Sequence, residues 1–142
     1  MQALNDVPNV VHVIQLAVAP VFLLTGVGAI LNVLVNRLSR VVDRFRVLGR
    51  SAPDTAAATQ AEMIMLGRRA HMIHWAIGLC TTCALLVCMV IATLFVGSMS
   101  GVEVPSLIAV LFITAMLLLV AGLLCFLREI TLATSSIQTM PR

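Results

Sequence analysis

The stretch from Val21 to Arg46, VFLLTGVGAILNVLVNRLSRVVDRFR, joins an apolar segment to an amphipathic one with no break signal between them. Its first part, up to Asn36, contains no charged residue. Its second part has an apolar stripe beside four arginines and one aspartate. Because the apolar side chains recur three and four residues apart across this change, a single helix should run through it. We therefore expect a transmembrane helix that leaves the bilayer and continues outside it.

The composition is that of an integral membrane protein. Of the 142 residues, 61% are hydrophobic and 11% are charged, against roughly 25% charged residues in soluble domains. The mean hydropathy is +1.09. A helix needs about 20 apolar residues to cross the hydrocarbon core, and three such stretches occur. The sequence predicts an all-α membrane protein with one domain, residues 1–142, and three transmembrane helices at about 9–36, 72–97 and 104–127.

Residues 37–70, between the first two spans, are expected to form a helical hairpin that extends those spans into the cytoplasm. Gly49 suits the C-terminal cap of the first arm, and the SAPDT sequence after Arg50 supplies a turn. Apolar side chains recur at helical spacing on both arms and should pack together: Val41, Phe45 and Leu48 on the first, and Met63, Met65 and Leu66 on the second.

Prolines and glycines predict the remaining boundaries. Pro20 lies inside the first span, where it removes a backbone hydrogen bond and predicts a kink over residues 16–20. A polar connection is expected to begin at Gly97, and Pro105 suits the first turn of the third helix. Arg128 and Glu129 are expected to end that helix.

The arginines predict the orientation. Seven of the nine lie between the first two spans, two follow the third, and none precedes the first span or joins the second to the third. Arginine-rich short loops stay on the cytoplasmic side. We therefore expect the hairpin and the C-terminus in the cytoplasm and the N-terminus outside. Residues 1–6 contain no base, so the first span lacks the basic start of a cleaved signal peptide.

One face of the first span is small and polar. In lipid, small residues let helix backbones approach each other and polar side chains need protein partners, so this face is expected to pack against other helices. A water-lined or ion-contacting face is the alternative. The face consists of His12, Gln15, Thr25, Gly26, Ala29, Asn32 and Asn36.

The arginine cluster after the first span is expected to contact lipid or another subunit. A single carboxylate cannot neutralise four arginines, so an anion should complete the cluster. Anionic lipid phosphate is one candidate. Acidic residues of a neighbouring helix or subunit are the other, namely Asp54, Glu62 or Glu129. The cluster consists of Arg37, Arg40, Asp43, Arg44 and Arg46.

Other residue types give weaker indications of chemistry. His71 and His74 share one face near the membrane boundary and are weak candidates for metal or haem ligands, although boundary residues beside Trp75 would look the same. Cys80 and Cys83 have CxxC spacing but lie in an apolar span, where packing accounts for them more simply.

The sequence has no catalytic constellation, so we expect neither an enzyme nor a cofactor. Arginines beside a span favour lipid over nucleic acid as a partner.

Three stretches carry a resemblance that covers nearly the whole chain. They are PVFLLTGVGAILN from Pro20, RLSRVVDRFR from Arg37 and FLREI from Phe126. Together they resemble a bacterial membrane family known as domain of unknown function 2721. The resemblance implies a three-span bacterial protein and brings no catalytic residue with it.

The sequence as a whole predicts a non-enzymatic protein of the bacterial inner membrane, either a homo-oligomer or an accessory subunit of a larger membrane complex. Two alternatives remain open at this point. One is a pore or ion-conducting oligomer lined by the first span, and the other is a haem or metal binder that uses the two histidines.

Overall fold

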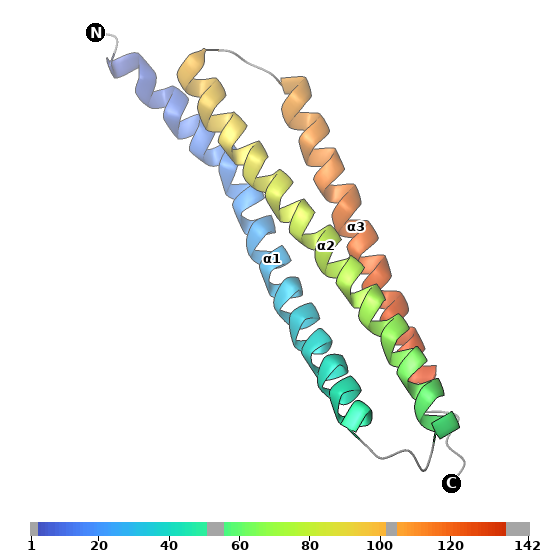
Figure 1. Cartoon of the computed structure of the whole chain (residues 1–142). Helices are drawn as coiled ribbons and strands as arrows, with labels where there is room; N and C mark the ends of the chain where they lie inside the picture. Colours follow the sequence, from blue (N-terminus) through green and yellow to red (C-terminus); the bar gives the residue numbers. More distant parts are fainter. Residues whose placement is uncertain (1–2, 51–55, 102–104, 136–142) are drawn as a thin grey trace.

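The computed structural model describes residues 3–50, 56–101 and 105–135 of the chain. They form three helices, α1 (Ala3–Arg50), α2 (Ala56–Ser100) and α3 (Pro105–Ser135). Figure 1 shows them as long rods with α2 in the middle, and α2 packs against both α1 and α3. All three are long and apolar enough to cross a membrane. The predicted all-helical class and the three apolar helices are confirmed.

Two of the helices are much longer than a bilayer is thick. α1 has 48 residues and α2 has 45, which at 1.5 Å per residue makes each about 70 Å long. The hydrocarbon core is about 30 Å thick. Each of these helices must therefore extend well beyond one or both membrane surfaces.

A seven-residue repeat determines which side chains lie between the helices. Residues seven apart return to nearly the same helix face, as in coiled coils. Most buried residues follow this spacing, with Ala17 of α1 an exception. They are Pro20, Val27, Leu34 and Val41 in α1; Leu66, Ile73, Cys80 and Val87, with Ala76, Cys83 and Val90, in α2; Ala115, Gly122 and Glu129 in α3.

α3 lies very close to α2 at Gly122. A Cβ atom at this position would lie 2.9 Å from the Sγ of Cys80, and 3.5 Å from the backbone oxygen of Ala76. A real Cβ atom does not come so close to another heavy atom, so α3 can lie this near to α2 only because residue 122 has no side chain. Small size at Gly122 and Ala115 thus brings the two backbones together in the middle of the molecule.

The helix ends differ from the sequence-based boundaries in three places. α2 continues through Gly97 to Ser100, and the turn comes at Gly101, whose φ of 67° suits glycine. α1 continues one residue past Gly49 to Arg50, and α3 continues past Glu129 to Ser135. The extension of α3 keeps Glu129 within a helix and against its two neighbours. The start of α3 at Pro105 is confirmed.

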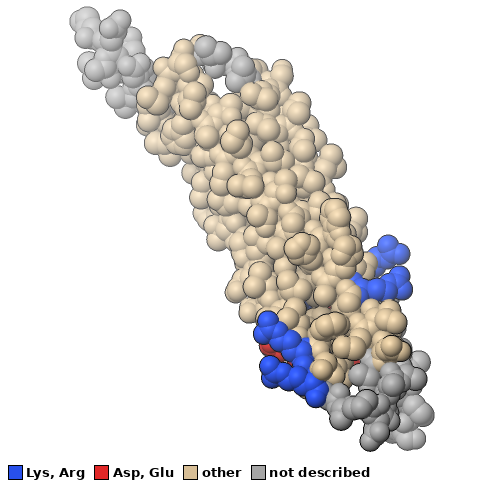
Figure 2. Space-filling view, in the orientation of Figure 1, with Lys and Arg blue, Asp and Glu red and all other residues tan. Residues whose placement is uncertain are grey.

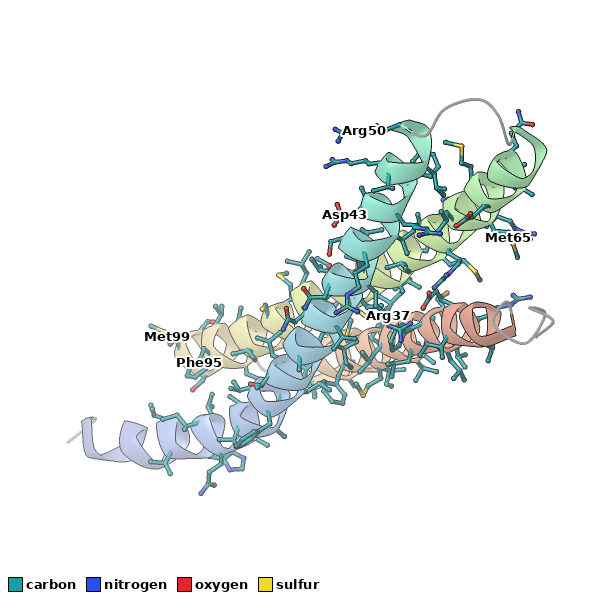
Figure 3. All side chains as sticks on the ribbon, turned by 90° about the horizontal axis from the view of Figure 1, so that it is seen from below. Arg37, Asp43, Arg50, Met65, Phe95 and Met99 are labelled. Carbon is teal, nitrogen blue, oxygen red and sulfur yellow. The ribbon has the colours of Figure 1, made fainter. Side chains whose placement is uncertain are left out.

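α1 remains helical through Pro20. Its ribbon changes direction between the N-terminal part and the rest, as Figure 3 shows from below. A proline in a helix removes one backbone hydrogen bond and tilts the preceding turn. The bend is the kink that the sequence predicts.

The packing of α1 against the start of α2 agrees with the predicted hairpin contacts in part. Val41 and Leu66 are buried in the common core, and Leu48 packs against it. Phe45 and Met65 are exposed, so the prediction was wrong for these two. They fall outside the seven-residue repeat, and Figure 3 shows Met65 pointing away from α1. The predicted SAPDT turn lies outside the described residues.

Candidate functional site

The basic side chains of the described residues gather at one end of the molecule. Figure 2 shows them over the lower part of the surface only. On α1 the first arginine is Arg37, on α2 the last is Arg69, and on α3 the first is Arg128. These three positions mark a common level, which is where the charge-free spans end. We call the part of the molecule beyond it the charged end.

At this level one carboxylate is buried between two arginines. Glu129 of α3 is 1% exposed. Its Oε2 accepts a hydrogen bond from Nη1 of Arg37 in α1 at 2.9 Å, and its Oε1 accepts one from Nη2 of Arg69 in α2 at 2.9 Å. All three helices therefore meet at a single carboxylate. We call Arg37, Arg69 and Glu129 the three-helix clamp.

The clamp continues the apolar core with charged residues. Glu129 follows Ala115 and Gly122 at seven-residue intervals. Arg69 lies seven residues before Ala76, so it occupies the same register in α2. Charged side chains thus take core positions where the spans reach the membrane surface. Buried charges are tolerated only when paired and hydrogen-bonded, and the clamp satisfies both oxygens of its one buried acid.

The two arginines are held in place, but not all of their hydrogen-bond donors have acceptors. The guanidinium of Arg37 lies over the ring of Phe126, 5.3 Å from its centroid, a cation–π contact that fixes its plane. Each arginine donates to Glu129 through one nitrogen, whereas a guanidinium carries five N–H donors. The Nε of Arg69 is buried and has no acceptor among the described residues. The clamp carries one net positive charge.

A second inter-helix pair lies farther into the charged end. Arg44 of α1 donates from Nε and Nη2 to Oε1 of Glu62 in α2, at 3.2 and 3.0 Å. Both side chains are largely exposed, at 61% and 42%, so the pair contributes at most about 1 kcal/mol. Glu62 and Glu129 are two of the three acids named as alternatives to lipid phosphate, and each contacts one arginine of the cluster, Arg44 and Arg37 respectively. The third, Asp54, lies outside the described residues.

The rest of the predicted arginine cluster is not part of these pairs. Arg40, Asp43 and Arg46 are exposed, and none of them has an ion-pair partner among the described side chains. Figure 3 shows Asp43 pointing away from α2 and α3. The acid that joins the three helices is therefore Glu129, whereas Asp43 contacts neither α2 nor α3 through an ion pair. From the sequence, Glu129 was expected mainly to end a helix.

The polar face of the first span does not pack within the chain. Residues of α1 that contact α2 lie on the opposite side of the helix, with Val27 and Leu34. The expected packing against other helices is therefore not made with α2 or α3, and it stays a prediction for a helix outside the chain. Apolar shape, rather than polarity, selected the intrachain contact. All seven predicted residues are exposed in the single chain: His12, Gln15, Thr25, Gly26, Ala29, Asn32 and Asn36.

The histidines and cysteines remain separate from the clamp. Nε2 of His71 accepts a hydrogen bond from the indole N–H of Trp75 at 3.0 Å, and His74 is exposed. Among the described residues, no group of three or more histidine, cysteine or acidic side chains could hold a metal ion. Cys80 and Cys83 are buried as free thiols in the helix core, as expected from packing.

Three long apolar helices and a charged end define the class as a multi-pass helical membrane protein. Within this class, the family model described as "Protein of unknown function (DUF2721)" matches residues 17–139. The chain belongs to this family, as its sequence resemblance predicts. The match includes all three residues of the clamp. No curated protein and no solved structure matches the chain.

Proposed function

We propose that the protein is a non-enzymatic homo-oligomer of the bacterial inner membrane that assembles through the polar face of α1. One observation carries the proposal: a small, polar helix face lies within an apolar span and is exposed in the single chain. Lipid tails offer no hydrogen bonds, so such a face favours a protein partner. We call it the open face of α1, and define it as Gln15, Thr25, Gly26, Ala29, Asn32 and Asn36.

Hydrogen bonding on the open face supports a second copy as the partner. Nδ2 of Asn36 donates to Oδ1 of Asn32 at 3.3 Å, which leaves the amide N–H groups of Asn32 and the Oδ1 of Asn36 able to bond outward. The face thus offers a donor and an acceptor one turn apart. In a twofold pair, each donor can meet the acceptor of the other copy, as a self-complementary interface requires.

The glycine on this face supports close approach. A Cβ atom added at Gly26 would meet nothing within 4 Å, so no contact inside the chain requires glycine there. With Ala29 three residues on, it leaves a shallow strip where a second helix backbone can approach. Helix propensity would favour alanine over glycine by about 1 kcal/mol. Close packing of a neighbouring helix would explain why position 26 is glycine rather than alanine.

Charge on the open face also suits a second copy. At about 100° per residue, Arg40 and Asp43 continue this face beyond the apolar span. They carry opposite charges three residues apart, and neither has an ion-pair partner among the described side chains. Two parallel copies can exchange Arg40–Asp43 pairs at the membrane surface, with a planar guanidinium on a carboxylate.

The test is the oligomeric state of the whole chain in bilayer discs of native lipid, measured by single-molecule photobleaching. Wild type should be oligomeric. Replacing both Asn32 and Asn36 by leucine should weaken association roughly fivefold or more, because interhelical hydrogen bonds in membranes contribute about 1 kcal/mol each. Val35→Leu is the matched control, because Val35 is exposed but lies outside the open face. A monomeric wild type, or an unchanged double variant, would contradict the proposal.

An ion-conducting oligomer is the competing outcome. In that case the open face would line water, and a cysteine at Asn32 would react with a charged, membrane-impermeant thiol reagent. In the proposed packed interface the same cysteine reacts slowly and no ion flux accompanies reconstitution. Cation flux that Asn32→Leu abolishes would replace the packed interface by a pore.

The proposed orientation has the charged end in the cytoplasm, as the arginines indicate. In a chain whose own cysteines are replaced, a cysteine at Ser100 should react with an impermeant reagent added outside intact cells. One at Gln60, an exposed residue of the charged end, should react only after lysis. The reverse pattern would invert the topology.

A further inference from the structure

The geometry points to a binding site for the phosphate of an anionic phospholipid at the three-helix clamp, formed by the outward-facing donors of Arg37 and Arg69. This site is separate from the open face of α1 and does not depend on self-assembly. The ligand chemistry is a phosphate monoanion, and its expected source is the headgroup of a membrane lipid.

The clamp has a positive charge that no residue of the clamp balances. Glu129 neutralises only one of the two arginines that contact it. The remaining positive charge lies where water gives way to hydrocarbon, so it is screened less than a charge in bulk solvent. The described part of the charged end contains eight arginines and three acids. Glu62 pairs with Arg44, and Asp43 is exposed on α1 and pairs with neither arginine of the clamp. No described carboxylate other than Glu129 contacts the clamp, so an anion from outside the chain can balance it.

The two arginines also keep unused hydrogen-bond donors. The side chains of Arg37 and Arg69 are 39% and 30% exposed, although each holds Glu129. A guanidinium can donate on several edges at once. Each arginine therefore presents N–H groups outward while its inner nitrogen stays on the acid. Both guanidinium groups are held on the same carboxylate, so they lie close to each other, and arginine forks match phosphate geometry well.

The depth of the clamp identifies the source of the phosphate. The charge-free span of each helix ends at this level, at Asn36 in α1, Ala70 in α2 and Leu127 in α3. The clamp is therefore at the height of the lipid headgroups on all three helices at once. A phosphate held there comes with its acyl chains beside apolar helix surface, whereas free phosphate gains no such contact.

Preorganisation distinguishes this site from the other arginines. Contacts with Phe126 and Glu129 hold the guanidinium of Arg37 before any ligand arrives, which lowers the entropy lost on binding. Arg46 is exposed and has no ion pair among the described side chains. It carries the same charge without this support, which makes it the matched control.

The experiment titrates the purified full chain with phosphatidylglycerol in neutral detergent at physiological salt and counts bound lipid by native mass spectrometry. Phosphatidylglycerol should bind more tightly than phosphatidylcholine. Arg37→Gln or Arg69→Gln should weaken it by about tenfold, as expected for losing a charge-assisted hydrogen bond. Arg46→Gln should change it by less than about twofold, because salt screens exposed charges. Circular dichroism verifies that each variant is folded.

Three further measurements distinguish a lipid site from a free-anion site and from a contact with a second copy. If Arg69→Gln does not fold, Arg69→Lys keeps the charge and should still lose binding, because a lysine has no planar fork. Competition by inorganic phosphate at equal concentration would show a free-anion site rather than a lipid site. Equal losses in Arg37→Gln and Arg46→Gln, or no preference for phosphatidylglycerol, would overturn the site. If the bound lipid is lost only when the oligomer dissociates, the site would require a second copy of the chain, and the proposed site within one chain would be wrong.

Discussion

Two helix faces of this protein are lined by small residues, and the chain uses them differently. The face of α3 that contains Gly122 lies against α2 so closely that a Cβ atom there would be 2.9 Å from the Sγ of Cys80. The open face of α1 contains Gly26, where an added Cβ atom would meet nothing within 4 Å. Both faces have room for close packing, but only the face with Gly122 is packed within the chain.

The difference shows that small residues permit a second helix to approach closely but do not determine which helix it is. In α3, Gly122 is followed seven residues later by Glu129, whose two arginine partners come from the same chain. In α1, Gly26 is followed by Asn32 and Asn36, whose side chains bond to each other. Residue size alone therefore does not distinguish the face that packs within the chain from the face that stays exposed.

The largest expected effect is on the face of α3 that contains Gly122 and Glu129. Glu129→Gln removes the only acid of the clamp and leaves two arginines facing each other. We expect a loss of roughly 3 kcal/mol in stability, since removing one partner of a buried pair leaves uncompensated charge. Thermal unfolding in detergent, followed by circular dichroism, measures it.

The control for this variant is Glu62→Gln, which breaks the exposed pair with Arg44. It should cost less than about 1 kcal/mol. Equal losses for the two glutamates would show that the buried clamp has no special role in holding the helices together.

Glycine substitutions test the comparison directly. Gly122→Ala should destabilise the chain by about 1–3 kcal/mol, because the added methyl group forces α3 away from α2. Gly26→Ala should leave the stability of the single chain unchanged or slightly raised, since it improves helix propensity. Unfolding measured under conditions that keep the protein monomeric decides this. A comparable loss at Gly26 would mean that the open face is occupied within the chain.

The cation–π contact has a smaller expected effect. Phe126→Leu keeps an apolar side chain of similar reach but removes the ring beneath Arg37. We expect a cost of about 0.5–1 kcal/mol from the lost contact. A double-mutant cycle with Arg37→Gln isolates this coupling, and additive losses would show that the ring and the guanidinium do not interact.

The smallest expected effect on the single chain is at Asp43. This carboxylate is exposed on α1 and has no ion pair among the described side chains. Asp43→Asn should therefore change the stability of the monomer by less than about 0.5 kcal/mol. The same change, like Arg40→Lys, should weaken assembly by up to about fivefold if the two residues pair between copies. Unchanged assembly in both variants would leave them as topology signals.

The helices themselves could be predicted from the sequence because their causes are local. The helices depend on features that can be read from short stretches of sequence. These are charge-free stretches of sufficient length, a basic segment between two of them and Pro105 at a helix start. The helix end at Gly97 was predicted too early because glycine commonly ends helices. The end at Glu129 was predicted too early because a charged residue is typical of a boundary unless another helix supplies its counter-charge. Glu129 continues a helix because two other helices supply its counter-charges.

The partners of each face were harder to predict. Polarity predicted that the polar face of α1 packs against other helices without indicating which ones, whereas the valine and leucine at positions 27 and 34 pack into the core within the chain. The signal that could have found the clamp is the seven-residue series Ala115, Gly122, Glu129 in α3. A series of small residues that ends in an acid predicts that the acid faces inward. Which arginines meet it depends on how three helices are staggered, and no single segment encodes that.

The three-helix clamp also imposes an order on synthesis. Arg37 and Glu129 are 92 residues apart in the chain, and Arg69 and Glu129 are 60 apart. When the ribosome has made α1 and α2 but not yet α3, Arg37 and Arg69 have no acid between them, so their repulsion opposes the packing of α1 against α2 at this level. Insertion of α3 supplies the missing charge. The contact between neighbours in sequence is therefore completed only by the helix that follows them, and a nascent chain stalled before Glu129 is left with an unclosed basic end.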